Sequence, residues 1–237
     1  MDFNTSTETE LILSSVRRFI QEELAPHEAE VEAAGTVRAD LAKELRDKAK
    51  ALGLFAMGMP KDVGGGGLST VELCLCEEEF GFTKDALVRR AFGSIPSTLV
   101  NCVGEQRQKY LFPAVRGEIN VAVAMTEPNA GSDAAGIETR ARADRDGYVL
   151  NGTKHFISDA DVADAFVVTA VTDPSRGAKG VSAFLIDRND DCTSIHPASN
   201  SMRPREKACC AFITIVAFAS SEYSILCRPR TPSRCRH

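Results

Sequence analysis

The chain has 237 residues, a formal charge of −5 and 43% apolar side chains. These values fit a globular protein with a sizeable core and space for two domains. The acidic balance argues against nucleic acid as the main partner, because phosphate binding needs a basic face. The longest apolar run, Ala211 to Ala219, is much shorter than the ~20 residues that cross a bilayer. Since the first residues form neither a secretory signal nor a transit peptide, we expect a cytoplasmic protein without a membrane partner.

The eight cysteines and four histidines lack the spacing of a metal site or a disulfide framework. No Cys-x-x-Cys pair occurs, and the histidines are scattered along the chain. Zinc sites and disulfide scaffolds need paired spacing. We therefore expect no metal and interpret the thiols as buried or incidental.

Residues 1–118 have the pattern of successive helices. Capping boxes, in which a hydroxyl and a carboxylate satisfy the first free amides, occur twice, and a proline or glycine follows most of the helical stretches. Four helices are expected: from the Thr7–Glu10 box to Pro26, from Leu41 to Gly53, from the Ser69–Glu72 box to Gly81, and from Glu105 to Val115. In the last helix we expect Gln106 to face water and Tyr110 and Leu111 to pack inward.

Four consecutive glycines, Gly64 to Gly67, lie between the second and third helices. Glycine-rich loops cradle phosphates in nucleotide-binding proteins, but those carry a Gly-Lys-Ser or Gly-Lys-Thr that is absent here. We therefore interpret the run as a flexible turn ahead of the third helix.

From about Val121 the apolar period becomes that of strands. Asn151-Gly152 is the strongest hairpin signal, because both residues tolerate a positive φ angle. Two further strands are expected at residues 165–171 and 181–186. A run of helices followed by a run of strands predicts an α+β chain, with a helical N-terminal domain and then an antiparallel β domain.

Two segments of the β region carry the chemical signal. The stretch from Val121 to Asp133 runs from an apolar strand into Glu127-Pro128 and the small residues Ala130-Gly131-Ser132, where a flat ring can approach bare backbone amides. The second segment, Lys154 to Ser158, follows about twenty residues later. A flavin needs polar groups at its pyrimidine edge, a donor near N5 and an apolar face. The two segments can supply each of these.

Both segments, in their order and spacing, resemble the acyl-CoA dehydrogenase family, and the resemblance extends from about Glu8 to Asp187. It implies a helical N-terminal domain at residues 1–118 and an antiparallel, β-barrel-like middle domain at 119–190. Family members continue into a C-terminal helical bundle. We expect that bundle to be missing, because residues 191–237 show no sustained helical period.

The resemblance also implies FAD as the cofactor and the residues that contact it. Ser158 would lie near flavin N5, and Phe156 stands where the family often has Trp, which keeps a stacking surface without the indole donor. Ser132 would also touch the acyl-CoA thioester arm; taken alone, Ser132 and Asp133 would more simply cap a turn. The nine expected cofactor residues are Val123, Ala124, Met125, Thr126, Gly131, Ser132, Phe156, Ile157 and Ser158.

The implied reaction is α,β-dehydrogenation of an acyl-CoA thioester, with electron-transfer flavoprotein as the electron acceptor. Glu127 is a carboxylate at the expected site, but a residue before proline at a strand end usually engages its side chain locally, so we favour a structural role. In the family the catalytic glutamate comes from the C-terminal helical domain. No catalytic residue is therefore assigned, and we expect weak or no turnover. Family members are homo-oligomers, and whether this chain assembles is left open.

Two other functions fit the same residues. The chain is alternatively a non-catalytic remnant that binds flavin or acyl-CoA, or an acyl-CoA oxidase or flavin monooxygenase of the same fold. A yellow protein that acyl-CoA bleaches without oxygen would favour catalysis, and a colourless one would favour the remnant.

Composition changes near residue 190. Five of the eight cysteines fall in the last 47 residues, and the charge is +4 after residue 190 against −9 before it. We interpret this tail as the product of a reading-frame shift near Asp190. The alternative is a native tail in which Ala211 to Ala219 forms a strand of the β domain. A family-like helical sequence in another frame of the downstream DNA would support the shift.

Overall fold

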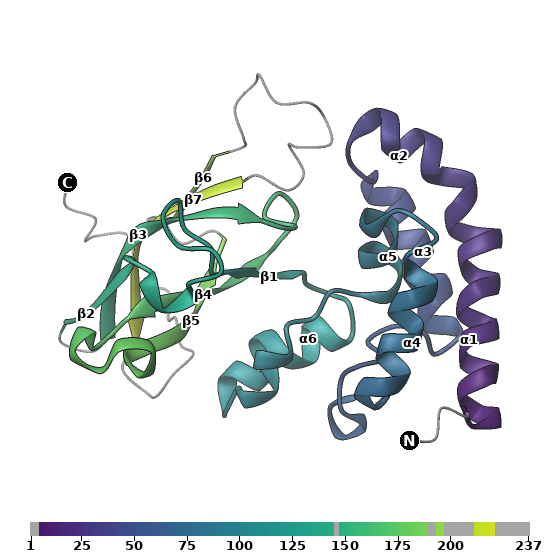
Figure 1. Ribbon diagram of the computed structural model, residues 1–237, viewed down its shortest axis with the longest axis horizontal. Helices are drawn as coiled ribbons and strands as arrows, with labels where there is room; N and C mark the ends of the chain where they lie inside the picture. Colours follow the sequence, from purple (N-terminus) through teal and green to yellow (C-terminus); the bar gives the residue numbers. More distant parts are fainter. Residues whose placement is uncertain (1–4, 145–146, 189–192, 197–210, 221–237) are drawn as a thin grey trace. The chain divides into compact units, whose positions relative to one another are not determined.

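The computed structural model describes residues 5–144, 147–188, 193–196 and 211–220. The chain divides into two compact units, one within Met1–Ser97 and Leu111–Glu118 and the other within Thr98–Tyr110 and Ile119–His237. The first unit is helical and the second contains a mixed sheet (Figure 1). A helical part followed by a sheet confirms the α+β class.

The helical unit is built around one apolar core, to which most of its helices contribute buried side chains. Short 3₁₀ turns connect several of the elements. The α-helices and π-helical turns of the chain are α1 (Thr7–Phe19), η1 (Ile20–Leu24), α2 (Glu28–Ala34), α3 (Ala39–Ala51), α4 (Thr70–Phe80), α5 (Asp85–Phe92), η5 (Arg107–Leu111) and α6 (Phe112–Val115).

Capping chemistry sets where the helices begin. The capping box at Ser69 is confirmed, since Ser69 and Glu72 exchange side-chain and backbone hydrogen bonds at the start of α4. The first helix is capped one residue earlier than expected, by Ser6, whose hydroxyl accepts the Thr9 N–H at 3.0 Å. The helical path also continues past Pro26 into α2, because proline is tolerated in a first turn, where its missing N–H is not needed.

The glycine run forms a packed turn and not a loose one. Gly65 donates its N–H to the Pro60 carbonyl at 3.0 Å and Gly66 donates to the Ala56 carbonyl at 3.1 Å. A Cβ at Gly65 would lie 2.2 Å from the Met59 carbonyl oxygen. The glycines therefore allow the backbone to fold back closely on residues 56–60, which a side chain would prevent.

The expected helix from Glu105 to Val115 is divided into η5 and α6. Tyr110 and Leu111 are buried as predicted. Gln106 is also buried, against expectation, because its side-chain carbonyl accepts the Val103 N–H at 3.1 Å. Helix α5 was not anticipated from the sequence.

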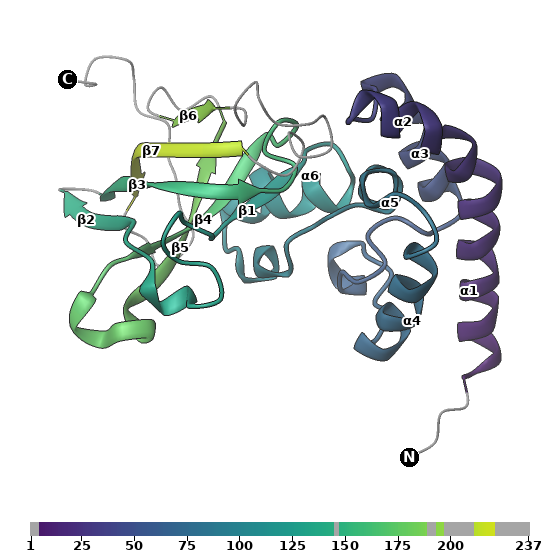
Figure 2. The same cartoon turned by 45° about the horizontal axis from the view of Figure 1, so that its top comes forward.

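Within the described ranges the sheet has seven strands. It is a mixed sheet (Figures 1 and 2). Its hydrogen-bonded order is β1-β4-β2-β3-β7-β6, with β5 pairing with β4. The expectation of an antiparallel sheet is wrong for two strand pairs, because β4 runs parallel to both β1 and β2. The β2–β3 hairpin serves as the crossover between β1 and β4, which allows these two strands to run parallel. Among the described strands the path has two ends, so the sheet is not closed. The strands are β1 (Val121–Ala124), β2 (Arg140–Asp144), β3 (Gly147–Ile157), β4 (Ala165–Val171), β5 (Val181–Asp187), β6 (Thr193–His196) and β7 (Ala211–Ser220).

Asn151-Gly152 does not form the predicted hairpin turn but lies in the middle of β3. The hairpin is instead formed by β2 and β3, in which Asp144 pairs with Gly147, and its turn lies outside the described residues. Gly152 serves close packing: a Cβ there would lie 2.2 Å from the Thr139 hydroxyl oxygen. A glycine in a strand interior marks such a close approach.

The far strands of the sheet lie beyond residue 190. β7 pairs antiparallel with β3 over most of its length, and β6 pairs with β7 (Figure 2). Residues 211–220 thus have a place in the sheet, as the alternative of a native strand in the tail expects. The rest of the tail after Arg188, apart from β6, lies outside the described residues.

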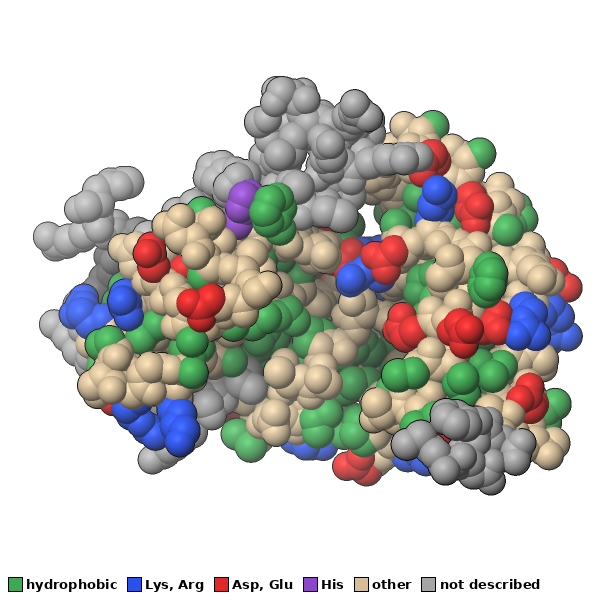
Figure 3. Space-filling view, viewed as in Figure 1, with side chains coloured by type: hydrophobic (Ala, Val, Ile, Leu, Met, Phe, Trp, Pro, Cys, Tyr) green, Lys and Arg blue, Asp and Glu red, His purple; other side chains and the backbone are tan. Residues whose placement is uncertain are grey.

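On the face shown in Figure 3, acidic and basic side chains are interspersed over the helical unit, so no field of one sign covers that part of the surface. No helix in the described ranges is long and apolar enough to cross a membrane. In the same ranges, no three His, Cys, Asp or Glu residues gather in a way that could hold a metal ion.

The Gly152→Ala variant should lose about 1–3 kcal/mol of unfolding free energy, the usual cost of overpacking, because the added methyl meets the Thr139 side chain. Urea unfolding of the purified chain measures this. Gly131→Ala is the matched control, since a Cβ there has no heavy atom within 4 Å, and it should change stability by less than about 0.5 kcal/mol. Equal losses in both variants would contradict the packing role of Gly152.

Candidate functional site

The two segments that the sequence singles out lie side by side in the sheet unit. The first leaves β1 at Ala124, and the second is the end of β3. His155 donates its backbone N–H to the Thr126 carbonyl at 2.7 Å. This hydrogen bond joins the two segments directly.

A buried ion pair joins the same segments a second time. Lys154, with no exposed side-chain surface, donates from Nζ to Glu127 Oε1 at 2.7 Å, to the Met125 carbonyl at 3.0 Å and to Thr169 Oγ1 at 3.2 Å. Three acceptors match the three donors of an ammonium group. The pair is therefore fully hydrogen-bonded on the lysine side.

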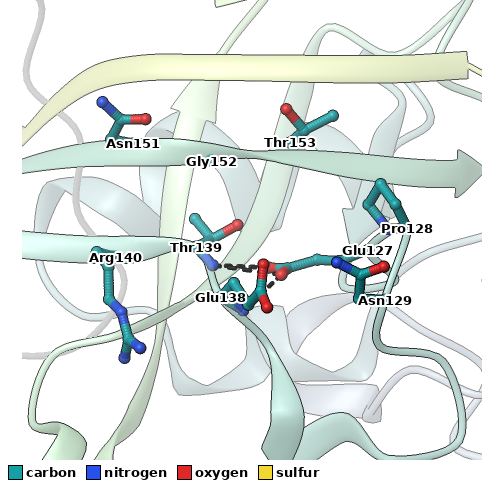
Figure 4. Close-up of a pocket in the computed structure, with 9 residues that line it drawn as sticks. All are labelled: Glu127, Pro128, Asn129, Glu138, Thr139, Arg140, Asn151, Gly152 and Thr153. Carbon is teal, nitrogen blue, oxygen red and sulfur yellow. Dashed lines mark hydrogen bonds between the residues drawn. The ribbon is translucent and has the colours of Figure 1, made fainter.

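The carboxylate of Glu127 is equally well satisfied. Its oxygens accept the backbone N–H groups of Glu138 at 2.5 Å and Thr139 at 3.0 Å (Figure 4), in addition to the Lys154 ammonium. Its own backbone bridges to Ala130 in both directions. These contacts fit the structural role favoured for Glu127, but its side chain binds Glu138, Thr139 and Lys154 and not the local turn, in which only its backbone takes part.

Burial and hydrogen bonding act in opposite directions on the pKa of Glu127. Burial alone would raise this pKa, but the hydrogen bonds from Lys154, Thr139 and Glu138 lower it below its ordinary value. Burial lowers the pKa of Lys154, and the Glu127 charge opposes that change. At neutral pH we infer a charged pair, since both sets of hydrogen bonds suit the ionised forms.

A bulge turns the end of β3 outward. The pairing with β7 shifts between Lys154 and Ile157, so that β3 carries one extra residue there. Lys154 and Ile157 both point inward, while Phe156 between them is 52% exposed and has a φ of +55°. Bulges commonly re-aim side chains in this way. The Phe156 ring stacks on His155, with ring centroids 3.7 Å apart.

The nine expected cofactor residues divide by exposure. Val123 and Met125 are 44% and 43% exposed and share one side of their segment, and Phe156 and Ser158 are exposed at the end of β3. Thr126 is half-buried. The side chains of Ala124 and Ile157 lie in the core of the sheet unit, so only their backbone can reach a ligand.

Gly131 and Ser132 follow the turn that Glu127 and Ala130 close, and both are exposed. No hydrogen bond among the described residues ties them to the second segment. The alternative that Asp133 caps a turn is supported only at the backbone, where its carbonyl accepts the Gly136 N–H at 3.0 Å, since its side chain makes no capping bond.

A pocket of about 620 Å³ opens on the Glu127 side of the site (Figure 4). None of the nine expected residues lines it. The Thr139 hydroxyl in its wall is buried and has no hydrogen-bond partner among the described residues. The pocket is lined by Glu127, Pro128, Asn129, Glu138, Thr139, Arg140, Asn151, Gly152 and Thr153.

The sequence reasoning missed Lys154 as a partner of Glu127. One signal was available: Lys154 has the same parity along β3 as the buried Leu150, so strand alternation places it inward. A lysine at an inward position needs a buried acid. The separation of the two residues in the sequence hides which acid it is.

The positive φ of Phe156 should make glycine the better small residue there. Phe156→Gly and Phe156→Ala lose the same ring, but alanine keeps the cost of the left-handed conformation, about 1 kcal/mol. Urea unfolding should therefore show Phe156→Gly as the more stable of the two. At Thr153, whose φ is not positive, the glycine variant should be the less stable one by roughly 0.5–1 kcal/mol. If the alanine variant were the more stable one at Phe156 as well as at Thr153, the backbone of Phe156 would not be strained.

Low pH should remove the contribution of the Glu127 carboxylate to the free energy of unfolding. A carboxyl with a lowered folded-state pKa stabilises the fold above its ordinary value of 4.5 and loses this effect as the pH falls through the lowered pKa. Glu127→Gln should cost about 3 kcal/mol at neutral pH, and the difference from the parent chain should narrow in unfolding titrations carried down to about pH 3. The exposed Glu105→Gln control should stay within about 0.5 kcal/mol throughout. If the difference in unfolding free energy between Glu127→Gln and the parent chain did not change with pH, the Glu127 charge would have no role in stability.

Comparisons with known proteins agree with this arrangement. The sequence profile described as "Acyl-CoA dehydrogenase, N-terminal domain" matches residues 6–118, and the one described as "Acyl-CoA dehydrogenase, middle domain" matches residues 122–214. Together they cover both the helices and the sheet.

Individual relatives point the same way. The chain is 37% identical over 195 residues to a short-chain specific acyl-CoA dehydrogenase of Clostridium acetobutylicum, covering 79% of this chain and 50% of the relative. It is 35% identical over 204 residues to CarC, a subunit of the caffeyl-CoA reductase-Etf complex of Acetobacterium woodii, covering 83% and 52%. Among solved structures, PigA with FAD and proline superimposes with a TM-score of 0.80 at 28% identity, covering 97% of this chain and 60% of PigA.

The two profiles, the relatives and the matching fold lead to one conclusion. The chain spans about half the length of the curated relatives it matches. It belongs to the acyl-CoA dehydrogenase family.

Proposed function

We propose that the sheet unit binds FAD at the two joined segments and that the chain serves flavin-dependent α,β-dehydrogenation of acyl-CoA thioesters. The observations that carry this proposal are the exposed apolar side chains of Val123 and Met125 on one segment and of Phe156 on the other, and the hydrogen bond between His155 and Thr126 that joins the two segments. Large exposed apolar side chains that gather in one place usually mark a binding site.

The donors at this surface suit a flavin. The Thr126 N–H has no acceptor among the described residues, and the hydroxyl-bearing Ser158 is exposed next to the buried Ile157. A flavin offers carbonyl oxygens and ring nitrogens to such donors and a flat face to Phe156. The relative PigA, solved with FAD, supports this assignment through its matching fold.

Each group has a definite task in the proposed reaction. Bound FAD would supply the acceptor for the hydride that leaves the β carbon. Phe156 would cover the ring, Ser158 would donate near its reactive edge, and Ser132 would contact the thioester arm of the substrate. Glu127 is not available as a base, because its carboxylate is buried and already accepts several hydrogen bonds. No residue of the described ranges is assigned that role.

The proposed substrate and partner follow the relatives. An acyl-CoA dehydrogenase and a caffeyl-CoA reductase complex act on CoA thioesters by their names, and the latter contains Etf. We therefore propose an acyl-CoA thioester as the substrate and an electron-transfer flavoprotein as the electron acceptor.

The proposed domain division places the helical domain at residues 1–118 and the start of the β domain at 119. Profile matches to 6–118 and 122–214 support this boundary. The middle-domain match passes residue 190, and β7 pairs with β3 beyond it. Both observations support a native strand at Ala211 to Ala219 over a frame shift near Asp190. The DNA sequence downstream remains the direct test.

Titration of the purified chain with FAD, followed by flavin fluorescence, tests the binding site. The parent chain should bind FAD, and Phe156→Ala should weaken binding by about 10-fold, the upper range of an aromatic contact. Phe82→Ala removes a phenylalanine that is 77% exposed in the helical unit and should leave the affinity unchanged. A parent chain that binds no FAD, or a Phe156→Ala variant that binds it equally well, would refute the assignment.

Anaerobic addition of a saturated short-chain acyl-CoA to the FAD-loaded chain tests the chemistry separately. Loss of the yellow colour would support dehydrogenation by this chain. A flavin that stays oxidised while acyl-CoA binds would instead assign a binding role, the alternative function expected from the sequence.

A further inference from the structure

We propose that Lys154 is a positioning residue that fixes the peptide between Met125 and Thr126, so that the Thr126 N–H faces the flavin. The inference rests on the proposed function and concerns how the site is held in shape. Neither the family profiles nor the names of the relatives assign a role to this lysine.

Lys154 holds the first segment through its backbone. Its ammonium donates to the Met125 carbonyl at 3.0 Å from the buried side of the sheet unit. The peptide bond is planar and trans, so the Met125 C=O and the Thr126 N–H point in opposite directions. Because the carbonyl is turned toward the buried ammonium, the N–H is turned away from it, and it has no acceptor among the described residues.

The next peptide is held as well. The Thr126 carbonyl accepts the His155 N–H at 2.7 Å, and the Glu127 N–H, on the other side of that peptide, donates to the Ala130 carbonyl at 2.9 Å. Two consecutive peptides are thus fixed from the neighbouring residues Lys154 and His155. The orientation of the Thr126 N–H is set before any ligand arrives.

The position of the ammonium group is fixed, because it also donates hydrogen bonds to Glu127 and Thr169 in two further directions. Glu127 is in turn anchored by the backbone N–H groups of Glu138 and Thr139. An apolar side chain at position 154 could fill the same volume, but it would leave the Met125 carbonyl without its donor. The peptide would then be free to rotate and to lose the outward N–H.

The variant Lys154→Met, whose unbranched side chain is one atom shorter and has no donors, tests this role in FAD titrations. Binding should weaken on the order of 10- to 100-fold, as when residues that orient a ligand-binding group are lost, and the visible absorption spectrum of the bound flavin should change, since a hydrogen bond to the ring is lost. Lys109→Met is the matched control: it removes a lysine that pairs with Asp187 at the surface of the same unit and should alter neither quantity. All titrations are run at a temperature well below the midpoint of thermal unfolding of each variant.

Hydrogen exchange gives a second readout that needs no flavin. In the flavin-free chain, the His155 amide should exchange faster in Lys154→Met than in the parent, while the core amide of Val168 on β4 keeps its protection. A residue with only a structural role would lower the unfolding midpoint and leave the flavin spectrum unchanged. Should Lys154→Met fail to fold, Glu127→Gln, which keeps its shape and loosens the ammonium, is measured by the same criteria with an expected loss of about 10-fold.

The outcomes separate the two proposals. A parent chain that binds no FAD overturns both. A parent chain that binds FAD, together with a folded Lys154→Met variant of equal affinity and spectrum, overturns the positioning role alone. Weaker binding with an altered spectrum in Lys154→Met, but not in Lys109→Met, supports it.

Discussion

The buried ion pair between Glu127 and Lys154 is the contact on which the rest of the site depends. It joins a loop after β1 to the end of β3 and ties both to β4 through Thr169. The desolvation free energy of burying such a pair offsets much of the attraction between its charges, and apolar side chains of similar volume often stabilise a fold equally well. The value of this pair therefore lies in its geometry. Its hydrogen bonds fix the direction of backbone groups, which an apolar contact cannot do.

Around this pair the sheet departs from regular alternation. One extra residue in β3 lets Lys154 and Ile157 point inward while Phe156 points out. The cost is a non-glycine residue in the left-handed region and exposed apolar surface next to it. Both features are unfavourable in the chain by itself. A flat ligand that covered this surface, as the family membership of the chain leads us to propose, would bury the apolar area, while the backbone of Phe156 would keep its conformational cost.

The strand order explains how distant residues meet. β1 pairs with β4 in parallel, and β2 and β3 form the hairpin between them. This crossover brings the end of β3 back to the loop after β1, so that Lys154 reaches Met125 and Glu127. An antiparallel meander of consecutive strands would have placed each strand beside its neighbour in the sequence. The parallel pairing is thus what assembles the site.

Local signals in the sequence determined much of this protein: the α+β order, the capped start of α4, the strands β4 and β5, and the two segments of the candidate site. They did so because capping, periodicity and small-residue loops act over a few residues. Tertiary structure alone decided the remainder. Asn151-Gly152 stays within β3 because the second residue packs against Thr139, and Lys154 binds Glu127 across the sheet. Each of these depends on a partner that is distant in the chain or on packing that no short pattern records.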